Sequence, residues 1–238
     1  MKRFILIFFL ILNLILFFSC SKNETPQSPP QSTCEKVTFP DANLETAIRV
    51  ALNKPTGDIC KNDCEKVSSL IQCLNSKNIT SIQGMQYFKN LQELEMYDNQ
   101  ISDISPLSGL TKLRYLNLSN NKISDISALS GLTDLYSLNL ANNQISNITS
   151  LSSLTNLIYL TLSNNTISDI TSLSDLLKLQ ELYLSNNLIE DIAALVTNCD
   201  AGGLGSGDTV YLEGNPVATG TPGPNITYLE NKGVIVNY

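Results

Sequence analysis

Five leucines spaced 22 residues apart constrain the fold of this chain more than any other feature of its sequence. Each begins the same template, L-x-x-L-x-L-x-x-N-x-I-x-x-I-x-x-L-x-x-L, and they are Leu91, Leu113, Leu135, Leu157 and Leu179. Because 22 is not a multiple of seven, the pattern excludes a heptad coiled coil. It indicates a solenoid, in which each repeat forms one coil and buries its apolar side chains against its neighbours.

Each part of the template predicts a local structure. The L-x-L segment predicts a short strand whose leucines point inward while the flanking residues point outward. The I-x-x-I-x-x-L segment has the three-residue spacing of a 3₁₀ or irregular turn that buries every third side chain. The asparagine amide can donate to and accept from backbone groups that the turn leaves unpaired. We therefore expect a buried ladder of hydrogen-bonded asparagines: Asn99, Asn121, Asn143, Asn165 and Asn187.

The segments on either side of the repeats predict caps for the apolar ends of the solenoid. Asp41 can accept the first N–H groups of a helix that ends before Pro55. One face of this helix carries an apolar stripe formed by Leu44, Ala47, Ile48 and Ala51. A degenerate first repeat follows, with Lys77 at the asparagine position and apolar residues at Ile79, Ile82, Met85 and Phe88. At the other end, the strand and asparagine return at residues 209 to 216, after a Gly-rich insertion at 201 to 207.

The repeats and both caps resemble bacterial internalin-type leucine-rich repeat proteins, whose repeats also have 22 residues. The resemblance implies an α/β solenoid of about seven coils, a leucine-rich-repeat horseshoe with a parallel β-sheet on its concave side and a helical N-terminal cap. The segment at 226 to 238 resembles the terminal cap of that family. We divide the chain accordingly into a cap at 34–68, repeats at 69–217 and a C-terminal cap at 218–238.

The N-terminus predicts export and lipid attachment. A basic start precedes an apolar run from Phe4 to Phe18, which is shorter than the roughly 20 residues of a spanning helix and fits a secretory signal. Ser19 and Cys20 resemble a bacterial lipobox, although Phe17 replaces the usual Leu. We expect a lipoprotein signal peptide at 1–19, and a lipidated Cys20 followed by a polar, Pro-rich tether over 20–33. The alternative is an ordinary signal peptide with an incidental cysteine.

Four cysteines gather in or near the N-terminal cap: Cys34, Cys60, Cys64 and Cys73. An exported chain favours disulfides, and four cysteines allow three connectivities. Free thiols and a thiolate metal site are the alternatives, but no His or C-x-x-C accompanies the cysteines, so we expect no metal. Cys199 lies apart, and we expect it to be free or to pair with another molecule.

The outward residues of the predicted strands are the candidate binding residues because they have no part in core packing. Five of the nine tyrosines of the chain fall at such positions, which favours contact with a protein or sugar. The alternative is that tyrosine merely has a high strand propensity. The candidates on the concave face are Glu93, Glu95, Tyr97, Tyr115, Tyr159, Tyr183 and Tyr211.

Composition excludes several other functions. The chain contains no His, which removes Ser-His-Asp and Cys-His catalysis together with the common zinc sites. Its net charge of −7 argues against a nucleic-acid partner.

Glu93 and Glu95 lie about 7 Å apart on one strand, within the range of inverting glycosidases, but an open sheet would not raise the pKa of either carboxyl group. A further ladder on the turns can bind a cation or cap local backbone, and capping is the expected role: Asp103, Asp125, Asn147, Asp169 and Asp191.

These observations predict a non-enzymatic binding protein without a cofactor, which engages a protein partner through its concave face. The family resemblance implies a host-cell receptor as the partner, and hence an adhesin. A bacterial envelope partner or glycan is the alternative, and a carboxylate-dependent glycosidase is the rival from another class. We expect the protein to be exported and anchored in the bacterial envelope through lipid on Cys20, exposed on the outer membrane.

Overall fold

The computed structural model describes residues 34–218 and 223–238, so the predicted signal peptide, Cys20 and the tether lie outside the described residues. Residues 34 to 238 form one compact unit, in which a single apolar core runs from the N-terminal cap to the C-terminal cap. Each coil contributes leucines and isoleucines that are completely buried, such as Leu116, Leu118 and Ile123. The core is therefore continuous along the stack, as the repeat pattern predicts.

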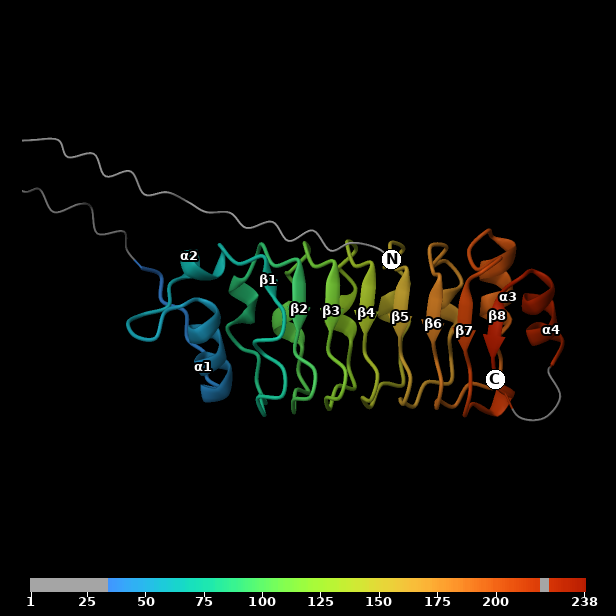
Figure 1. Ribbon diagram of the computed structural model, residues 1–238, viewed down its shortest axis with the longest axis horizontal. Coiled ribbons are helices and arrows are strands. Elements are labelled where there is room, and N and C mark those ends of the chain that lie inside the picture. Colours follow the sequence, from blue (N-terminus) through green and yellow to red (C-terminus); the bar gives the residue numbers. More distant parts are fainter. Residues whose placement is uncertain (1–33, 219–222) are drawn as a thin grey trace, which may run out of the picture. The chain divides into compact units, whose positions relative to one another are not determined.

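One side of the unit is a parallel eight-stranded sheet in which the strands follow their order in the chain (Figure 1). The central leucines Leu94, Leu116, Leu138, Leu160 and Leu182 are direct partners across neighbouring strands, so the 22-residue register is confirmed. The strands are β1 (Ser69–Leu70), β2 (Glu93–Glu95), β3 (Tyr115–Asn117), β4 (Ser137–Asn139), β5 (Tyr159–Thr161), β6 (Glu181–Tyr183), β7 (Thr209–Tyr211) and β8 (Ile235–Asn237).

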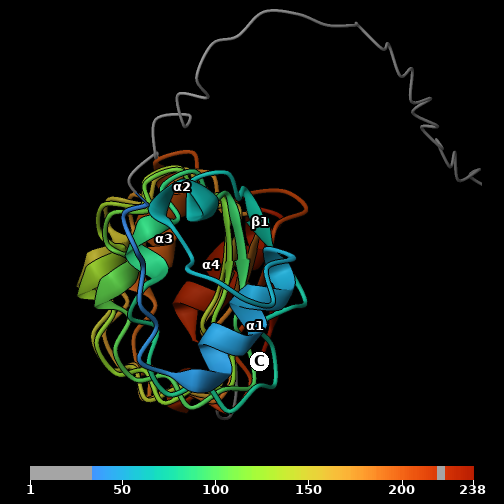
Figure 2. The same ribbon diagram turned by 90° about the vertical axis from the view of Figure 1, so that its left-hand side faces the viewer.

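The opposite side of the unit consists mainly of short 3₁₀ turns, as the I-x-x-I-x-x-L spacing predicts (Figure 2). These turns cover Met85–Tyr87, Ser105–Leu107, Ser127–Leu129, Thr149–Leu151 and Thr171–Leu173, with a further turn at Pro216–Ala218. The coil after β6 differs because the eight-residue helix α3 (Ala193–Asp200) replaces its 3₁₀ turn. Asn198 of α3 is completely buried, donates to the carbonyl groups of Leu173 and Leu176, and accepts the N–H of Leu204.

The predicted asparagine ladder is present, and its members share one pattern of hydrogen bonds, although Asn143 is half-buried and not buried as expected. The side-chain amide of Asn121 donates to the carbonyl groups of Met96 and Leu118, both at 3.0 Å, and its oxygen accepts the N–H of Ile101. Each asparagine thus joins the backbone of its own coil to that of the preceding coil. The ladder ends at Asn99, whose oxygen accepts the N–H groups of Lys77 and Ile79, and it extends to Asn215 at the other end.

The residue before each ladder asparagine has a special role that the sequence analysis missed. Asp98, Asn120, Asn142, Asn164 and Asn186 all have φ between 55° and 58°. This left-handed region is costly for most residues and is best tolerated by Asn, Asp and Gly. Gly214 takes the same position before Asn215, with φ 74°. The Asn-Asn pairs of the sequence therefore combine one exposed turn residue with one residue that bonds the coils together.

Hydrogen bonds and apolar packing hold the N-terminal cap together and attach it to the first coil. Helix α1 (Ala42–Ala51) begins after Asp41, whose Oδ1 accepts the N–H groups of Asn43 and Leu44, and it ends before Pro55 as predicted. Leu44, Ala47 and Ile48 are buried, but the assignment of Ala51 to the buried stripe is wrong. Ala51 is the last residue of the helix and is exposed, and Leu52 packs against the core in its place.

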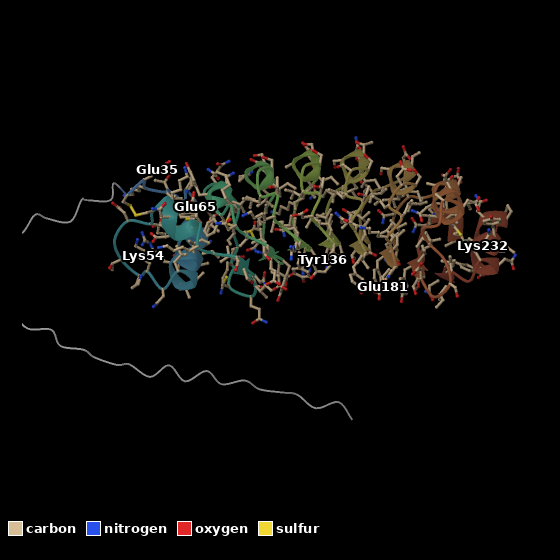
Figure 3. The ribbon with its side chains drawn as sticks, turned by 90° about the horizontal axis from the view of Figure 1, so that it is seen from above. Glu35, Lys54, Glu65, Tyr136, Glu181 and Lys232 are labelled. Atoms are coloured by element: carbon tan, nitrogen blue, oxygen red, sulfur yellow. A yellow bond between two sulfur atoms is a disulfide. The ribbon has the colours of Figure 1, made fainter. Side chains whose placement is uncertain are left out.

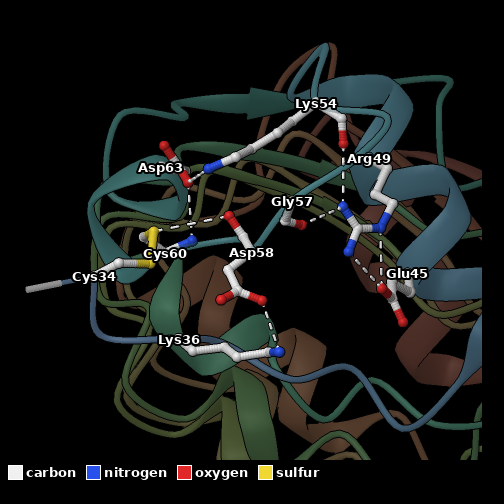
Figure 4. A network of polar contacts seen from close by, with 9 residues as sticks. All are labelled: Cys34, Lys36, Glu45, Arg49, Lys54, Gly57, Asp58, Cys60 and Asp63. Carbon is white, nitrogen blue, oxygen red and sulfur yellow. Dashed lines mark hydrogen bonds and ion pairs between the residues drawn. A yellow bond between two sulfur atoms is a disulfide. The ribbon is translucent and has the colours of Figure 1, made fainter.

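A disulfide between Cys34 and Cys60 and several ion pairs hold the loop after α1 (Figure 4). An antiparallel bridge between Lys36 and Cys60 brings the two cysteines together, with their Cα atoms 5.3 Å apart. The candidates Cys64 and Cys73 are free thiols in the structure, contrary to the prediction of a disulfide role for all four. Cys64 ends the short helix α2 (Lys61–Cys64) and points into the core, where burial raises the pKa of its thiol to about 12. Cys199 is also free.

The first and last coils depart from the repeat length. Leu70 of β1 pairs with Leu94 at a spacing of 24 residues, so the first coil contains two residues more than the template between its strand and Leu74. At the other end, helix α4 (Pro224–Asn231) and strand β8 form the last layer. Since β8 pairs with β7, the sheet has one strand more than the seven expected coils.

Candidate binding face

The outward side chains of β2 to β7, together with the next outward residue after each strand, form one continuous face that we call the concave face. Its first column contains Glu93, Tyr115, Ser137, Tyr159, Glu181 and Thr209, which are partners across successive strands. Its second column contains Glu95, Asn117, Asn139, Thr161, Tyr183 and Tyr211. The structure therefore brings the predicted binding residues onto one side of the molecule, opposite the 3₁₀ turns (Figure 3).

The N-terminal part of this face is a closed hydrogen-bond network centred on Glu95. Its Oε2 accepts the N–H of Gln72 at 3.2 Å and the side-chain amide of Asn75 at 3.0 Å. Its Oε1 accepts the hydroxyl of Tyr115 at 3.2 Å, and burial together with this carboxylate raises the pKa of Tyr115. Both oxygens of Glu95 are thus bonded within the protein, and the residue links β2 to β3 and to the segment that follows β1.

The middle of the face is low and polar because its side chains are short. Ser137, Asn139 and Thr161 are half-buried, and the oxygen of Asn139 accepts the N–H of Ala141. Tyr159 stands beside these residues with 41% of its surface exposed. Among the predicted tyrosines it is the most open to a partner. Tyr97, near the N-terminal cap, is half-buried.

The C-terminal part of the face carries an aromatic pair between two carboxylates. The rings of Tyr183 and Tyr211 stack with centroids 4.4 Å apart and planes 5° from parallel. The hydroxyl of Tyr183 donates to Oε2 of Glu181 at 2.9 Å, and this bond raises the pKa of Tyr183 to about 12. At the other end of the pair, Oε2 of Glu213 accepts the hydroxyl of Ser185 at 2.7 Å. The two tyrosines and the two carboxylates are therefore held in fixed positions.

Tyr136 is a candidate that the sequence analysis missed. It lies just before β4, is 38% exposed and lies on the same side of the unit as Glu181 (Figure 3). Tyr115 lies close enough for Tyr136 to contribute to the rise in its pKa. The equivalent residue is Arg114 in the preceding coil and Ile158 in the next. This variation between coils is the sequence signal that could have identified Tyr136.

The turn ladder of aspartates has the capping role predicted for it. Oδ1 of Asp125 accepts the N–H of Ser127 at 2.8 Å, and Asp103, Asn147, Asp169 and Asp191 make the same bond two residues ahead. The backbone bond from Ser127 lowers the pKa of Asp125, and a bond from the Thr171 hydroxyl, together with the backbone bond, lowers the pKa of Asp169. Across the described ranges 34–218 and 223–238, no group of three or more metal-ligating side chains comes together.

Two open grooves lie against α1. They have volumes of about 490 and 290 Å³ and share Thr46 and Val50, which is 73% exposed. Neither groove contains a candidate residue from the concave face. In the part of the chain that the structure describes, no helix has the length and apolarity needed to cross a bilayer.

Comparisons with known proteins agree with this architecture. A family model for leucine-rich repeats matches residues 89–131, 111–153 and 155–197. The crystal structure of internalin C2 from Listeria monocytogenes is 33% identical in sequence, with a TM-score of 0.55. The match covers 76% of this chain and 90% of that structure. The chain belongs to the internalin family. Leucine-rich repeats of this kind serve as protein-binding modules.

Two further internalins of Listeria monocytogenes are longer than the part that this chain matches. A solved structure of internalin F is 31% identical with a TM-score of 0.63, and the match covers 83% of this chain and 63% of that one. Internalin H is 34% identical over 96 residues, which are 39% of this chain and 17% of that protein. This internalin therefore matches only part of the length of each of these relatives.

Proposed function

We propose that this internalin is a non-enzymatic binding protein that engages a protein partner through its concave face. The exposed Tyr159, set beside the low polar middle of the sheet, is the observation that carries the proposal. Tyrosine combines a large contact area with a polar end and is enriched among residues that dominate binding energies. A host-cell receptor is the proposed partner, which makes the protein an adhesin. A bacterial envelope protein or glycan is the alternative.

The hydrogen bonds of Glu95 support binding over catalysis. A glycosidase needs one carboxyl group to give up a proton and a second to act as base or nucleophile. Both oxygens of Glu95 accept bonds from Gln72, Asn75 and Tyr115, and Glu93 beside it is only half-buried. This arrangement supports a structural role for Glu95 and leaves the pair without the water-excluding pocket that acid catalysis requires.

The binding proposal is tested with the Tyr159→Ala variant. Surface proteins of host cells and of the bacterial envelope are captured on the immobilised protein, identified, and then measured singly for affinity. We expect Tyr159→Ala to weaken binding of the true partner by about 2 kcal/mol, or roughly 30-fold, because the exposed ring becomes buried contact area in the complex. The matched control is Asp125→Ala on the opposite side. If Asp125→Ala abolishes binding while Tyr159→Ala has no effect, the concave face is not the binding site.

We further propose that acylation of Cys20 anchors this internalin in the bacterial envelope, exposed on the outer membrane. More than one acyl chain is needed for lasting attachment, and the lipoprotein class that Cys20 resembles normally carries more than one. We expect the wild-type protein to enter the detergent phase on phase separation and Cys20→Ala to remain in the aqueous phase. Ser21→Ala keeps the cysteine and serves as the control. Equal partitioning of wild type and Cys20→Ala would rule out the lipid anchor.

A further inference from the structure

We propose that the stacked pair Tyr183 and Tyr211, with Glu181 and Glu213, forms a site for an arginine side chain in a basic segment of the partner. The inference deepens the proposed function and rests on it, because it assigns a partner chemistry to one part of the concave face. Three independent features of the described residues lead to it: the aromatic stack, the positions of the carboxylates and the distribution of charge.

The aromatic stack offers a free ring face to a flat cation. Tyr183 stacks on Tyr211 with one face of its ring, at a centroid distance of 4.4 Å. Its neighbour on the other side in the same column is Thr161, whose short side chain is half-buried. A guanidinium group can therefore lie above Thr161 and against the outer face of Tyr183. Arginine stacks in this way because its group is planar and weakly hydrated, whereas the lysine ammonium is compact and strongly hydrated.

The carboxylates stand on both sides of the aromatic pair along the strands. Glu181 lies two residues before Tyr183 on β6, about 7 Å away along the strand, and Glu213 lies two residues after Tyr211, in the turn that follows β7. Oε2 of Glu181 accepts the hydroxyl of Tyr183, which fixes the carboxylate beside the ring. The other oxygen of this carboxylate, Oε1, can accept the N–H groups of a guanidinium. Tyr159 is the partner of Glu181 on the adjacent strand and borders the site with a second, exposed ring.

The charge of the molecule is concentrated in the half that contains this site. Residues 34 to 122 carry ten basic and ten acidic side chains, whereas residues 123 to 238 carry two basic and eleven acidic ones. The two basic residues, Lys178 and Lys232, lie outside the strands, and they contact Asn156 and Asp200, respectively. The aromatic pair thus lies in a half with a net charge of −9, which attracts a basic segment from a distance.

The experiment uses the full chain in non-ionic detergent micelles and three fluorescein-labelled hexapeptides. Each peptide contains glycine and serine with two arginines, two lysines or two citrullines, and binding is measured by fluorescence anisotropy at two salt concentrations. We expect the arginine peptide to bind at least threefold more tightly than the lysine peptide. The uncharged citrulline peptide should bind at least tenfold more weakly. Binding of the arginine peptide should weaken as salt rises.

Matched variants locate the site. Tyr183→Leu and Glu181→Gln should each weaken the arginine peptide about tenfold or more, while Tyr183→Phe, which keeps the ring face, should stay within about threefold of wild type. Glu190→Gln removes one exposed carboxylate from the same coil, outside the strands, and should change the affinity less than twofold. Melting curves of all variants establish that the fold is retained, and Tyr211→Leu replaces Tyr183→Leu if that variant melts early.

Several results would overturn the proposal. They are an arginine peptide that shows no saturable binding, equal binding of the arginine and lysine peptides, and a Glu190→Gln variant as weak as Glu181→Gln. Any of these results would show that the arginine peptide does not bind or that it binds only through general charge attraction. The proposed function is tested independently of the arginine site. A captured partner that still depends on Tyr159 supports concave-face binding even when the arginine peptide does not bind.

Discussion

Four coils carry two neighbouring asparagines with different roles, and the chemistry of the side chain explains both. Asn142 is exposed and has φ 56°, where a short polar side chain is tolerated. The amide of Asn143 donates to the carbonyl groups of Leu118, Leu140 and Ala141, while its oxygen accepts the N–H of Ile123. The first residue allows the chain to turn, and the second satisfies the backbone groups that the turn exposes.

This difference gives the first stability prediction. Asn143→Ala should lower the free energy of unfolding by more than about 2 kcal/mol, because several backbone groups lose their partner at about 1–3 kcal/mol each. Asn142→Gly should change it by less than about 1 kcal/mol, because glycine adopts the same φ without strain. Urea unfolding followed by circular dichroism measures both. Equal losses in the two variants would contradict the assigned roles.

The sequence predicted which residues lie on the concave face but not how they bond to each other. Period-two alternation and the 22-residue register are enough to place Glu95 and Tyr115 on adjacent strands. The hydrogen-bond network of Glu95 also needs Gln72 and Asn75, which reach it because the first coil contains two additional residues. An irregular coil cannot be aligned from the repeat, so the prediction of Glu95 as a free contact residue missed its structural role.

At the level of elements, a single carboxylate both caps helix α1 and links it to the first coil. Oδ1 of Asp41 caps the helix, while its Oδ2 accepts the N–H of Thr80 at 2.8 Å, the hydroxyl of Thr80 at 2.8 Å and the N–H of Ser81 at 3.2 Å. Burial alone would raise the pKa of Asp41, but these hydrogen bonds outweigh it and lower the pKa from 3.8 to about 2. The residue thus joins the N-terminal cap to the first coil in its ionised form.

The lowered pKa of Asp41 predicts a pH dependence of stability. A carboxyl group whose pKa is lower in the folded state stabilises the fold above its unfolded pKa, and this stabilisation disappears as the pH falls from about 4 to 2. We expect Asp41→Asn to cost on the order of 1–2 kcal/mol at pH 7, after solvent screening is allowed for, and the difference from wild type to vanish near pH 2. Urea unfolding across this range measures the difference. The exposed Asp134→Asn variant is the control, and a difference that stays constant with pH would contradict the role of Asp41.

The elements that the sequence predicted least well lie where the repeat breaks. The capping aspartate and the apolar stripe were sufficient to predict α1, because both are local signals. Helix α3 occupies a position where the other coils have a 3₁₀ turn, and its buried Asn198 bonds to the preceding coil and to Leu204. The bonds from Asn198 to Leu173 and Leu176 join residues more than 20 apart in sequence, so no local pattern indicates them. The pairing of β8 with β7 is also a long-range contact of this kind.

At the scale of the whole molecule, the stack is a one-dimensional array in which each strand pairs only with its neighbours in sequence. The apolar ends of the array are covered by α1 on one side and by α4 with β8 on the other. Stability in such an array is approximately a sum of the contributions of coils and of the interfaces between them. A local defect should therefore act most strongly on the coils beside it.

Hydrogen exchange of the Leu160→Ala variant tests this property. Leu160 is completely buried at the centre of β5, and its truncation should cost about 3 kcal/mol through lost burial and a cavity. We expect exchange to accelerate most for the amide groups of β4, β5 and β6, and least for α1 and α4, because opening spreads through neighbouring interfaces. Tyr159→Ala, on the adjacent outward position, should leave the exchange pattern close to that of wild type. A uniform acceleration from α1 to β8 would instead show that all coils open together, and in that case a partner bound at one end of the concave face would stabilise the other end equally.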